Sequence, residues 1–302
     1  MTSSKFPAPF LARVHYYESP TRNSTAYETG ADGAPNAFVV IGGLGDGPHT
    51  VPGLTKIAAR LDPAHGGPNY SLFEIRMRSS FVGYGTSSLA EDVVHIAALV
   101  KYLRSIGKSK IVLCGHSTGT QQDIMEYVNS GKQDDEPVDG FVLQGPVSDR
   151  QSIEQLRSMF PDHDFADTLS CAKEYIADGR KDDCLPRAKL PPIFAGDPIS
   201  AYRYHSLATK GGDDDYFSTD LDDDFVNRVW GSFKKPFLVL HCDEDEFVPP
   251  HIDKAALVEK WRKASTHMSP LSGVLLKANH TLDSDEAVQG FGDKVVEFLS
   301  TV

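Results

Sequence analysis

Short apolar runs alternate with segments of helical periodicity along most of the chain. The apolar runs are rich in β-branched residues, as buried strands are, and lie at 36–41, 70–75, 110–114, 138–144, 236–241 and 272–277, after a leading strand pattern at 12–17. Helical patterns lie at about 53–61, 88–105, 120–128 and 284–299. The alternation predicts an α/β fold, with a mainly parallel central sheet flanked by helices.

This alternation stops between residues 146 and 235. Amphipathic helical patterns at 152–160 and 165–179, four prolines between residues 186 and 198, and acidic clusters at 213–215 and 222–224 replace it. Insertions at this point of an α/β chain commonly form a cap over the site. We therefore expect a single domain over residues 1–302 with a helical cap at about 146–235. The acidic clusters lack the spacing of a calcium loop, which favours solvated or helix-capping roles over cation binding.

A G-x-S-x-G sequence at 115–119 joins the apolar run at 110–114 to the helical pattern at 120–128. A strand, this turn and a helix together make the nucleophile elbow of an α/β-hydrolase. The glycines let strand and helix pass closely while the serine adopts a strained backbone conformation. The context predicts that Ser117 is a catalytic nucleophile and that the Thr118 N–H, at the helix N-terminus, is an oxyanion donor.

A glycine-rich turn, GGLGDG at 42–47, follows the first buried strand pattern. It lacks the glycine spacing and the lysine of a phosphate-binding loop. The equivalent loop of an α/β-hydrolase supplies a second oxyanion N–H. We assign that role to Leu44, with Gly43 as the alternative.

Candidates for the acid and the base follow the last two strand patterns. Asp243 and Asp245 lie in the turn after 236–241, and Asp245 is favoured because Phe-Val-Pro follows it at the usual spacing. Among the eleven histidines, His280 is the one just beyond a strand, where a general base can reach the serine. The order Ser117, Asp245, His280 is the triad order of the α/β-hydrolases.

Composition and net charge restrict the classes of molecule that the protein could bind. Hydrophobic residues make up 40% of the 302 residues, enough for one large core, and the net charge of −12 argues against a nucleic-acid or anionic-membrane partner. No apolar run approaches the ~20 residues of a membrane span, and residues 1–13 lack a signal-peptide pattern. We therefore expect a cytoplasmic protein, and the predicted hydrolase triad indicates a small-molecule ester as its substrate. The oligomeric state leaves no signature in the sequence.

Four cysteines complete the reactive side chains. Cys114 and Cys242 lie in apolar strand patterns and are interpreted as buried, reduced thiols. Cys171 and Cys184 could either pair or remain free. Neither cysteines nor histidines cluster at the spacing of a metal site, so we expect no metal or other cofactor.

Five segments, one of which contains the elbow, resemble the sequences of a known family: 41–47, 78–89, 115–121, 146–150 and 213–221. Over about residues 10–300 the chain resembles a fungal and plant family of α/β-hydrolases that includes the siderophore esterases of the SidJ type. The resemblance implies that Ser117, Asp245 and His280 hydrolyse ester bonds of fusarinine-type siderophores inside the cell and so release iron. A general carboxylesterase, a peptidase or a ligand-binding hydrolase fold without turnover are the alternatives.

A siderophore would need a wide pocket with apolar walls and a few polar anchors. Candidate wall residues are Tyr84, Tyr216 and Phe217. Candidate anchors for hydroxamate or carboxyl oxygens are Arg78, Arg150 and Arg203. Structural ion pairs with nearby acids are the favoured reading of each arginine, and packing on the sheet is an equal alternative for the aromatic residues.

Overall fold

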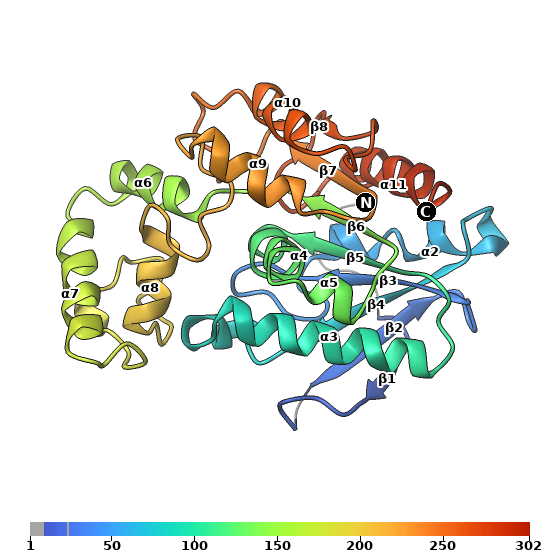
Figure 1. The fold of residues 1–302 in the computed structure, drawn as a ribbon, viewed down its shortest axis with the longest axis horizontal. Helices are drawn as coiled ribbons and strands as arrows, with labels where there is room; N and C mark the ends of the chain where they lie inside the picture. The colour runs from blue at the N-terminus through green and yellow to red at the C-terminus, as the bar shows by residue number, and fades with distance from the viewer. Residues whose placement is uncertain (1–8, 23) are drawn as a thin grey trace.

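The computed structural model describes residues 9–22 and 24–302, which form an eight-stranded sheet in the order β1-β2-β4-β3-β5-β6-β7-β8. The strands are β1 Arg13–Tyr16, β2 Thr25–Gly30, β3 Asn36–Ile41, β4 Tyr70–Arg76, β5 Ile111–His116, β6 Gly140–Gln144, β7 Phe237–Cys242 and β8 Gly273–Leu275. From β4 to β8 all neighbours are parallel, whereas β1 and β2 are antiparallel (Figure 1). The predicted α/β-hydrolase sheet is confirmed. Most of the segment at 1–13 lies outside the described residues.

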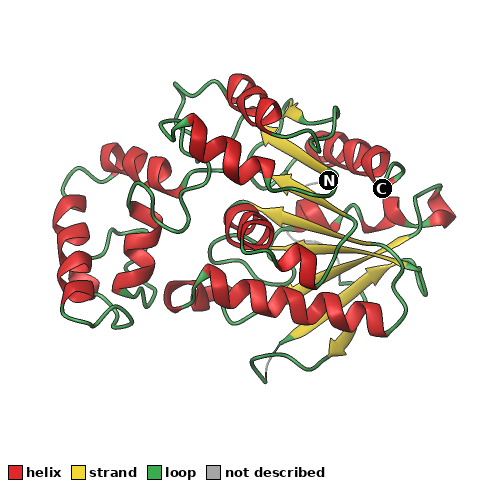
Figure 2. Cartoon of the chain, viewed as in Figure 1, coloured by secondary structure: helices red, strands yellow, loops and turns green. Residues whose placement is uncertain are grey.

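Helices cover both faces of the sheet (Figure 2). One face is packed by α1 Pro52–Thr55, α2 Ala58–Leu61 and α11 Asp285–Leu299, and the other by α3 Leu89–Ser105, α4 Glu126–Asn129, α9 Asp223–Gly231 and α10 Lys254–Ala264. The remaining helices are α5 Lys132–Asp135, α6 Asp149–Met159, α7 Phe165–Ala177, α8 Ala201–Ala208, the short turns η1 Pro63–His65, η2 Phe81–Thr86 and η4 Arg187–Lys189, and the π-helix η3 Thr120–Met125. Each buried strand of the parallel region therefore lies between two helical layers, which explains its continuous apolar sequence.

Two of the predicted helices differ in how well the apolar periodicity of the sequence predicts their bounds. Helix α3 agrees with the pattern expected at 88–105, and it begins after Ser88, whose side chain and that of Glu91 form a reciprocal capping box. The helix expected at 53–61 is instead two single turns, α1 and α2. The first turn lies so close to the His280 loop that a Cβ on Gly53 would be 2.5 Å from the Thr281 carbonyl oxygen. The interruption between α1 and α2 thus occurs where the chain packs against the His280 loop, a contact that the local sequence does not encode.

The segment at 146–235 is divided between two packing environments. Helices α6, α7 and α8 form a lobe beside the sheet (Figure 1) with its own apolar cluster, built from residues of the lobe and from Tyr84. Helix α9 packs instead on the main core, where Trp230 stacks on Trp261 of α10 with ring centroids 4.7 Å apart. The lobe thus reaches the rest of the molecule near the C-terminal edge of the parallel strands, where α/β proteins hold their ligands.

Candidate active site

The serine elbow has the close backbone packing that its sequence predicts. Strand β5 ends at His116, and Ser117 has a φ of +52°, in the left-handed region that a non-glycine residue rarely adopts. A Cβ on Gly115 would be 2.4 Å from the Gly119 carbonyl oxygen, and one on Gly119 would be 2.6 Å from the Gly42 carbonyl oxygen. Side chains at either glycine would therefore force the strand, the helix and the neighbouring loop apart, and the strain at Ser117 is held by its surroundings.

The structure brings Ser117, His280 and Asp245 together in one hydrogen-bonded chain. His280 Nε2 lies 2.7 Å from Ser117 Oγ, and His280 Nδ1 lies 2.8 Å from Asp245 Oδ2. A carboxylate only accepts hydrogen bonds, so Nδ1 carries the proton and Nε2 presents its lone pair to the serine hydroxyl. The imidazole and the carboxylate are both buried, at 4% exposure. This geometry allows the imidazole to take the proton of the hydroxyl.

The two aspartates of the turn after β7 have separate partners. Asp245 faces the imidazole with one oxygen and accepts the Phe247 N–H with the other, at 3.0 Å. Asp243 accepts the N–H groups of Lys277 and Ala278, both at 3.0 Å, and although burial opposes it, these backbone hydrogen bonds lower the pKa of Asp243. The structure thus pairs Asp245 with the histidine and places Asp243 under the loop that carries it.

Glu246 belongs to the same turn and was not singled out in the sequence. Its Oε2 accepts the backbone N–H of His280 at 3.0 Å. Phe247, the next residue, places its ring edge-on to the imidazole with the centroids 4.8 Å apart. Both contacts depend on how the turn folds back on a loop 34 residues away, so the periodicity of the chain carries no signal for them.

The glycine-rich loop lies directly against the serine. A Cβ on Gly43 would be 2.7 Å from Ser117 Cβ. The two residues predicted to supply oxyanion donors are in contact, because the Leu44 N–H donates to Thr118 Oγ1 at 3.1 Å. The alternative donor, the Gly43 N–H, is bound by Asp46 Oδ2 at 2.9 Å. The loop is therefore fixed beside the nucleophile by a carboxylate and a hydroxyl.

All three candidate arginines are ion-paired. Arg203 is buried at 2% exposure with its guanidinium 2.6 Å from Asp214, so its charge is paired within the protein. Arg150 pairs with Asp215 and Asp220. Arg78 is half-exposed and lies 2.6 Å from Glu91, a residue of the capping box. The contacts of the three arginines are therefore the ion pairs with nearby acids that the sequence analysis favoured over substrate binding.

The acidic cluster at 213–215 is explained by the same contacts, since Asp214 and Asp215 are buried partners of arginines and are not solvated. In the second cluster, Asp222 caps α9, as expected of a helix-capping role. Within residues 9–22 and 24–302, no group of three or more His, Cys, Asp or Glu could hold a metal ion.

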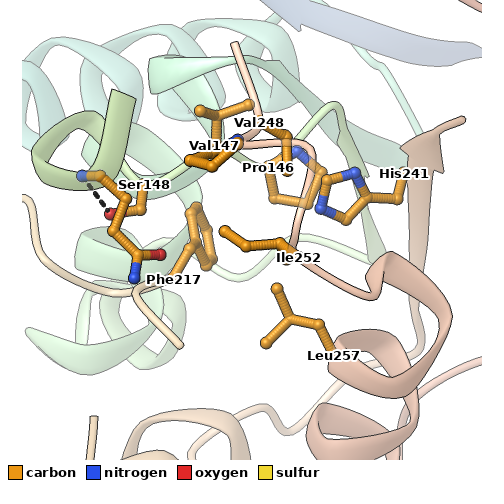
Figure 3. Close-up of a pocket in the computed structure, with 10 residues that line it drawn as sticks. Pro146, Val147, Ser148, Phe217, His241, Val248, Ile252 and Leu257 are labelled. Carbon is orange, nitrogen blue, oxygen red and sulfur yellow. Dashed lines mark hydrogen bonds between the residues drawn. The ribbon is translucent and has the colours of Figure 1, made fainter. Parts of the chain in front are cut away.

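The aromatic candidates lie mainly in apolar clusters. Tyr84 packs in the cluster of the α6–α8 lobe and donates its hydroxyl to Asp197 at 2.8 Å. Tyr216 and Phe217 are buried in the main core, and the Tyr216 hydroxyl donates to Glu126 at 2.7 Å. Phe217 also lines a hollow (Figure 3).

Two hollows lie beside segments that carry the site, although Ser117, His280 and Asp245 line neither of them. The first has an empty volume of about 230 Å³, part of it open to solvent, and is lined by Pro146, Val147, Ser148, Gln151, Phe217, His241, Val248, Pro249, Ile252 and Leu257 (Figure 3). The second, of about 290 Å³, lies along the glycine-rich loop and is lined by Gly42, Gly43, Asp46, Gly47, Ile75, Met77, Ser79 and Ser80. One hollow is mainly apolar and the other mainly polar.

The remaining expectations concern thiols and membranes. Cys114 and Cys242 are buried and free, as predicted. Cys171 and Cys184 are also free, so of the two alternatives left open for them the structure has free thiols and no disulfide between them. Over the described part of the chain, no helix has the length and apolar character needed to cross a bilayer.

Comparisons with known proteins agree with this architecture. The family described as protein of unknown function, DUF1749, matches residues 1–300. Esterase AN6793 of Emericella nidulans is 30% identical over 316 residues, covering 84% of this chain and 82% of the relative, and the fusarinine C esterase sidJ of Aspergillus fumigatus is 29% identical over 356 residues, covering 100% and 99%. The solved structure of the siderophore hydrolase EstB from Aspergillus fumigatus has a TM-score of 0.80 at 27% identity and covers 100% of this chain and 99% of its own.

Proposed function

This chain belongs to the DUF1749 family of α/β-hydrolases, and we propose that it is a serine esterase that cleaves ester bonds of fusarinine-type hydroxamate siderophores to release iron in the cytoplasm. One observation carries the catalytic part of the proposal: the chain of hydrogen bonds from Ser117 through His280 to Asp245, with the serine held at positive φ beside the glycine-rich loop. The names of the relatives, an esterase, a fusarinine C esterase and a siderophore hydrolase, support the substrate class.

In the proposed mechanism, His280 Nε2 takes the Ser117 proton as Oγ attacks the ester carbonyl carbon. The imidazole then returns this proton to the departing alcohol oxygen, leaving an acyl-enzyme. Water attacks the acyl carbonyl with the same base, and the carboxylic acid leaves. Asp245 keeps the proton on Nδ1 and stabilises the imidazolium that forms in each half of the cycle.

The oxyanion forms between the elbow and the glycine-rich loop in this proposal. The N–H groups of Leu44 and Thr118 are its donors, and one such donor is typically worth about 3–4 kcal/mol of transition-state stabilisation. In the structure, the Thr118 hydroxyl occupies the Leu44 N–H. An oxyanion would displace that hydroxyl, exchanging a neutral acceptor for a charged one, and charged acceptors form the stronger hydrogen bonds. The loop is thus prepared for a negative charge that the resting site lacks.

The open form of the hollows favours a second candidate within the esterases. Their volumes of about 230 and 290 Å³ include space open to solvent, and neither hollow is lined by Ser117 or His280, whereas pockets for drug-sized ligands enclose most of the ligand surface. A bulky siderophore would keep most of its mass outside them, or the α6–α8 lobe would shift to admit it. An esterase for small acyl esters needs neither, so this reading stands as the alternative substrate class.

A hydrolysis screen distinguishes a siderophore esterase from an esterase for small acyl esters. Purified protein is assayed with ferric and iron-free fusarinine-type siderophores, short p-nitrophenyl esters and peptides, with Ser117→Ala as the blank. We expect the highest kcat/KM for the siderophore esters, because contacts remote from the scissile bond orient them. Rapid turnover of short esters with no cleavage of any fusarinine-type ester would replace the siderophore with a small-ester substrate. Cleavage of the peptides alone would contradict the ester class.

A further inference from the structure

We infer that Gln144 and His116 form a bridge beneath the nucleophile that holds the His280 loop in place, so that both act as positioning residues. The inference rests on the proposed function, because it concerns how the base is aligned with the serine. Gln144 is the last residue of β6 and His116 the last of β5, and the two are register partners in the parallel pair. Their side chains are buried, at 0% and 2% exposure. Neither takes part in the proposed proton transfers.

Gln144 contacts all three segments that carry the proposed catalytic residues. Its Nε2 donates to the His280 carbonyl oxygen at 3.1 Å and to Cys242 Sγ, on the strand before the acid, at 3.3 Å. Its own backbone carbonyl accepts the Ser117 N–H at 3.0 Å. One side chain thus links the elbow, the base loop and the end of β7, which are distant in the sequence.

The donors and acceptors of this bridge follow from its chemistry. The His280 carbonyl can only accept, so the amide NH₂ of Gln144 faces it and the amide oxygen faces His116 Nδ1. His116 Nδ1 must therefore carry a proton. Burial, helped by the nearby His280 ring, lowers the pKa of His116 to about 4, which keeps this imidazole neutral at physiological pH. A neutral ring also avoids a second positive charge when His280 takes up its proton.

Asp243 holds the start of the His280 loop at Lys277 and Ala278, but His280 itself has fewer supports. Strand β8 has three residues, and both Lys277 and Leu282 have positive φ values, +57° and +56°. The backbone of His280 makes its hydrogen bonds to side chains: Glu246 accepts the N–H, and Gln144 donates to the carbonyl. Removing the Gln144 amide would leave a buried carbonyl without this donor, and the loop would lose one of the two side chains that hold the residue. The imidazole would then spend less time within hydrogen-bond distance of Ser117 Oγ.

Gln144→Leu tests the bridge, with the rate of Ser117 labelling by a fluorophosphonate as the readout. That rate reports how well the base activates the serine, and it is expressed per active site after titration with the same probe. We expect it to fall about tenfold, the effect of losing one buried hydrogen bond of about 1.4 kcal/mol. For a p-nitrophenyl ester, kcat should fall by a similar factor with KM unchanged.

Gln133→Leu is the matched control. Gln133 is also a buried glutamine whose amide donates two hydrogen bonds, in this case to the backbone carbonyls of Val128 and Ser232. It lies on α5, away from the elbow. We expect it to lower the melting temperature, as Gln144→Leu should, while the labelling rate per active site stays at the wild-type value. Equal slowing in the two variants would show a general loss of stability and would overturn the bridge.

His116 provides a rescue test within the same bridge. In His116→Asn the side-chain amide can place an N–H donor near the position of Nδ1, whereas His116→Leu cannot donate. We expect the Asn variant to label near the wild-type rate and the Leu variant about tenfold more slowly, and the His116→Leu/Gln144→Leu double variant to be little slower than either single one. Multiplicative losses, or an Asn variant as slow as Leu, would contradict the bridge. A wild-type protein that is never labelled would contradict the proposed function, and the bridge with it.

Discussion

Two buried aspartates in this molecule each pair with a basic side chain, one at the edge of the sheet and one in the α6–α8 lobe. Asp245 binds His280, and Asp214 binds Arg203, with 2.8 and 2.6 Å between the paired atoms. All four side chains are almost fully buried. In composition and burial the two pairs are similar, yet their surroundings differ.

The pair at the sheet edge ends on a hydroxyl under backbone strain. His280 Nε2 contacts Ser117 Oγ, and the serine lies against the glycine-rich loop. The lobe pair ends on Ser206, which lies in the regular helix α8 and donates to Asp214. Burial and pairing are therefore shared by structural and catalytic clusters. What separates them is whether the pair leads to a reactive atom that a strained turn presents beside hydrogen-bond donors.

The largest effect should come from breaking the sheet-edge chain at its reactive end. Ser117→Ala or His280→Ala should lower kcat by about 10⁴-fold or more, and the double variant should be little worse, because the two residues act as a unit. Steady-state kinetics on a p-nitrophenyl ester and circular dichroism check rate and fold together. A folded Ser117→Ala protein with activity within tenfold of wild type would show that the reaction does not use this serine.

A smaller but still severe effect is expected at the acid. Asp245→Asn removes the acceptor that fixes the proton on His280 Nδ1, and comparable changes in serine proteases cost about 10⁴-fold in kcat. Asp243→Asn should cost no more than about tenfold, because Asp243 holds backbone N–H groups of the loop and does not touch the imidazole. Side-by-side kcat values decide between them, and a greater loss in Asp243→Asn would reassign the acid.

The lobe pair should respond in stability and not in catalysis. Arg203→Met breaks the buried ion pair with Asp214, and breaking a buried pair on one side typically costs about 3–5 kcal/mol of unfolding free energy. The turnover number per folded molecule should stay near the wild-type value. Urea denaturation and active-site-titrated kinetics measure the two quantities. If instead stability is retained and KM for the siderophore rises sharply, Arg203 contacts the substrate and the comparison between the pairs fails.

A third buried basic side chain, His241, differs from the two paired ones because its Nδ1 has no hydrogen-bond partner among the described residues. Burial lowers the pKa of His241 to about 4, below the ~6.5 of an exposed histidine. Between these values the unfolded chain binds a proton that the folded protein refuses, so stability falls as pH decreases from about 6.5 to 4. His241→Phe should remove about 2–3 kcal/mol of the loss between pH 7 and 4.5. Identical pH dependence in both proteins, measured by urea denaturation, would contradict this.

Much of the fold was predictable because the parallel sheet imposes a simple pattern on its strands. Strands buried on both faces are apolar throughout, and loops at their C-terminal ends carry the polar side chains, which is why the G-x-S-x-G motif singled out Ser117 and the position beyond the last strand singled out His280 as candidates. Strand β2 was missed because its sequence, TAYETG, has few apolar residues and it pairs antiparallel outside the region of parallel strands. The π-helical turn η3, after the elbow, has no sequence signature.

The contacts around the site were less predictable than its core residues. Gln144 and Glu246 act through hydrogen bonds to a loop more than thirty residues away, so nothing local marks them. The arginines proposed as substrate anchors found partners within the protein, and those partners lie up to 70 residues away. In a chain with 42 acidic residues, an arginine meets a carboxylate more readily than a ligand. Pairing of this kind depends on the tertiary fold, which local propensity does not determine.

The central claim is that Ser117 is the nucleophile of an ester hydrolase, and covalent labelling tests it most directly. The full-length protein is treated with a fluorophosphonate until inactive, digested, and mapped by peptide mass spectrometry, with Ser117→Ala and the neighbouring serine variant Ser148→Ala in parallel. The account predicts one adduct, on Ser117, that is lost in Ser117→Ala and retained in Ser148→Ala. Inactivation with the adduct on another residue, or an active enzyme that the probe leaves unmodified, would contradict it.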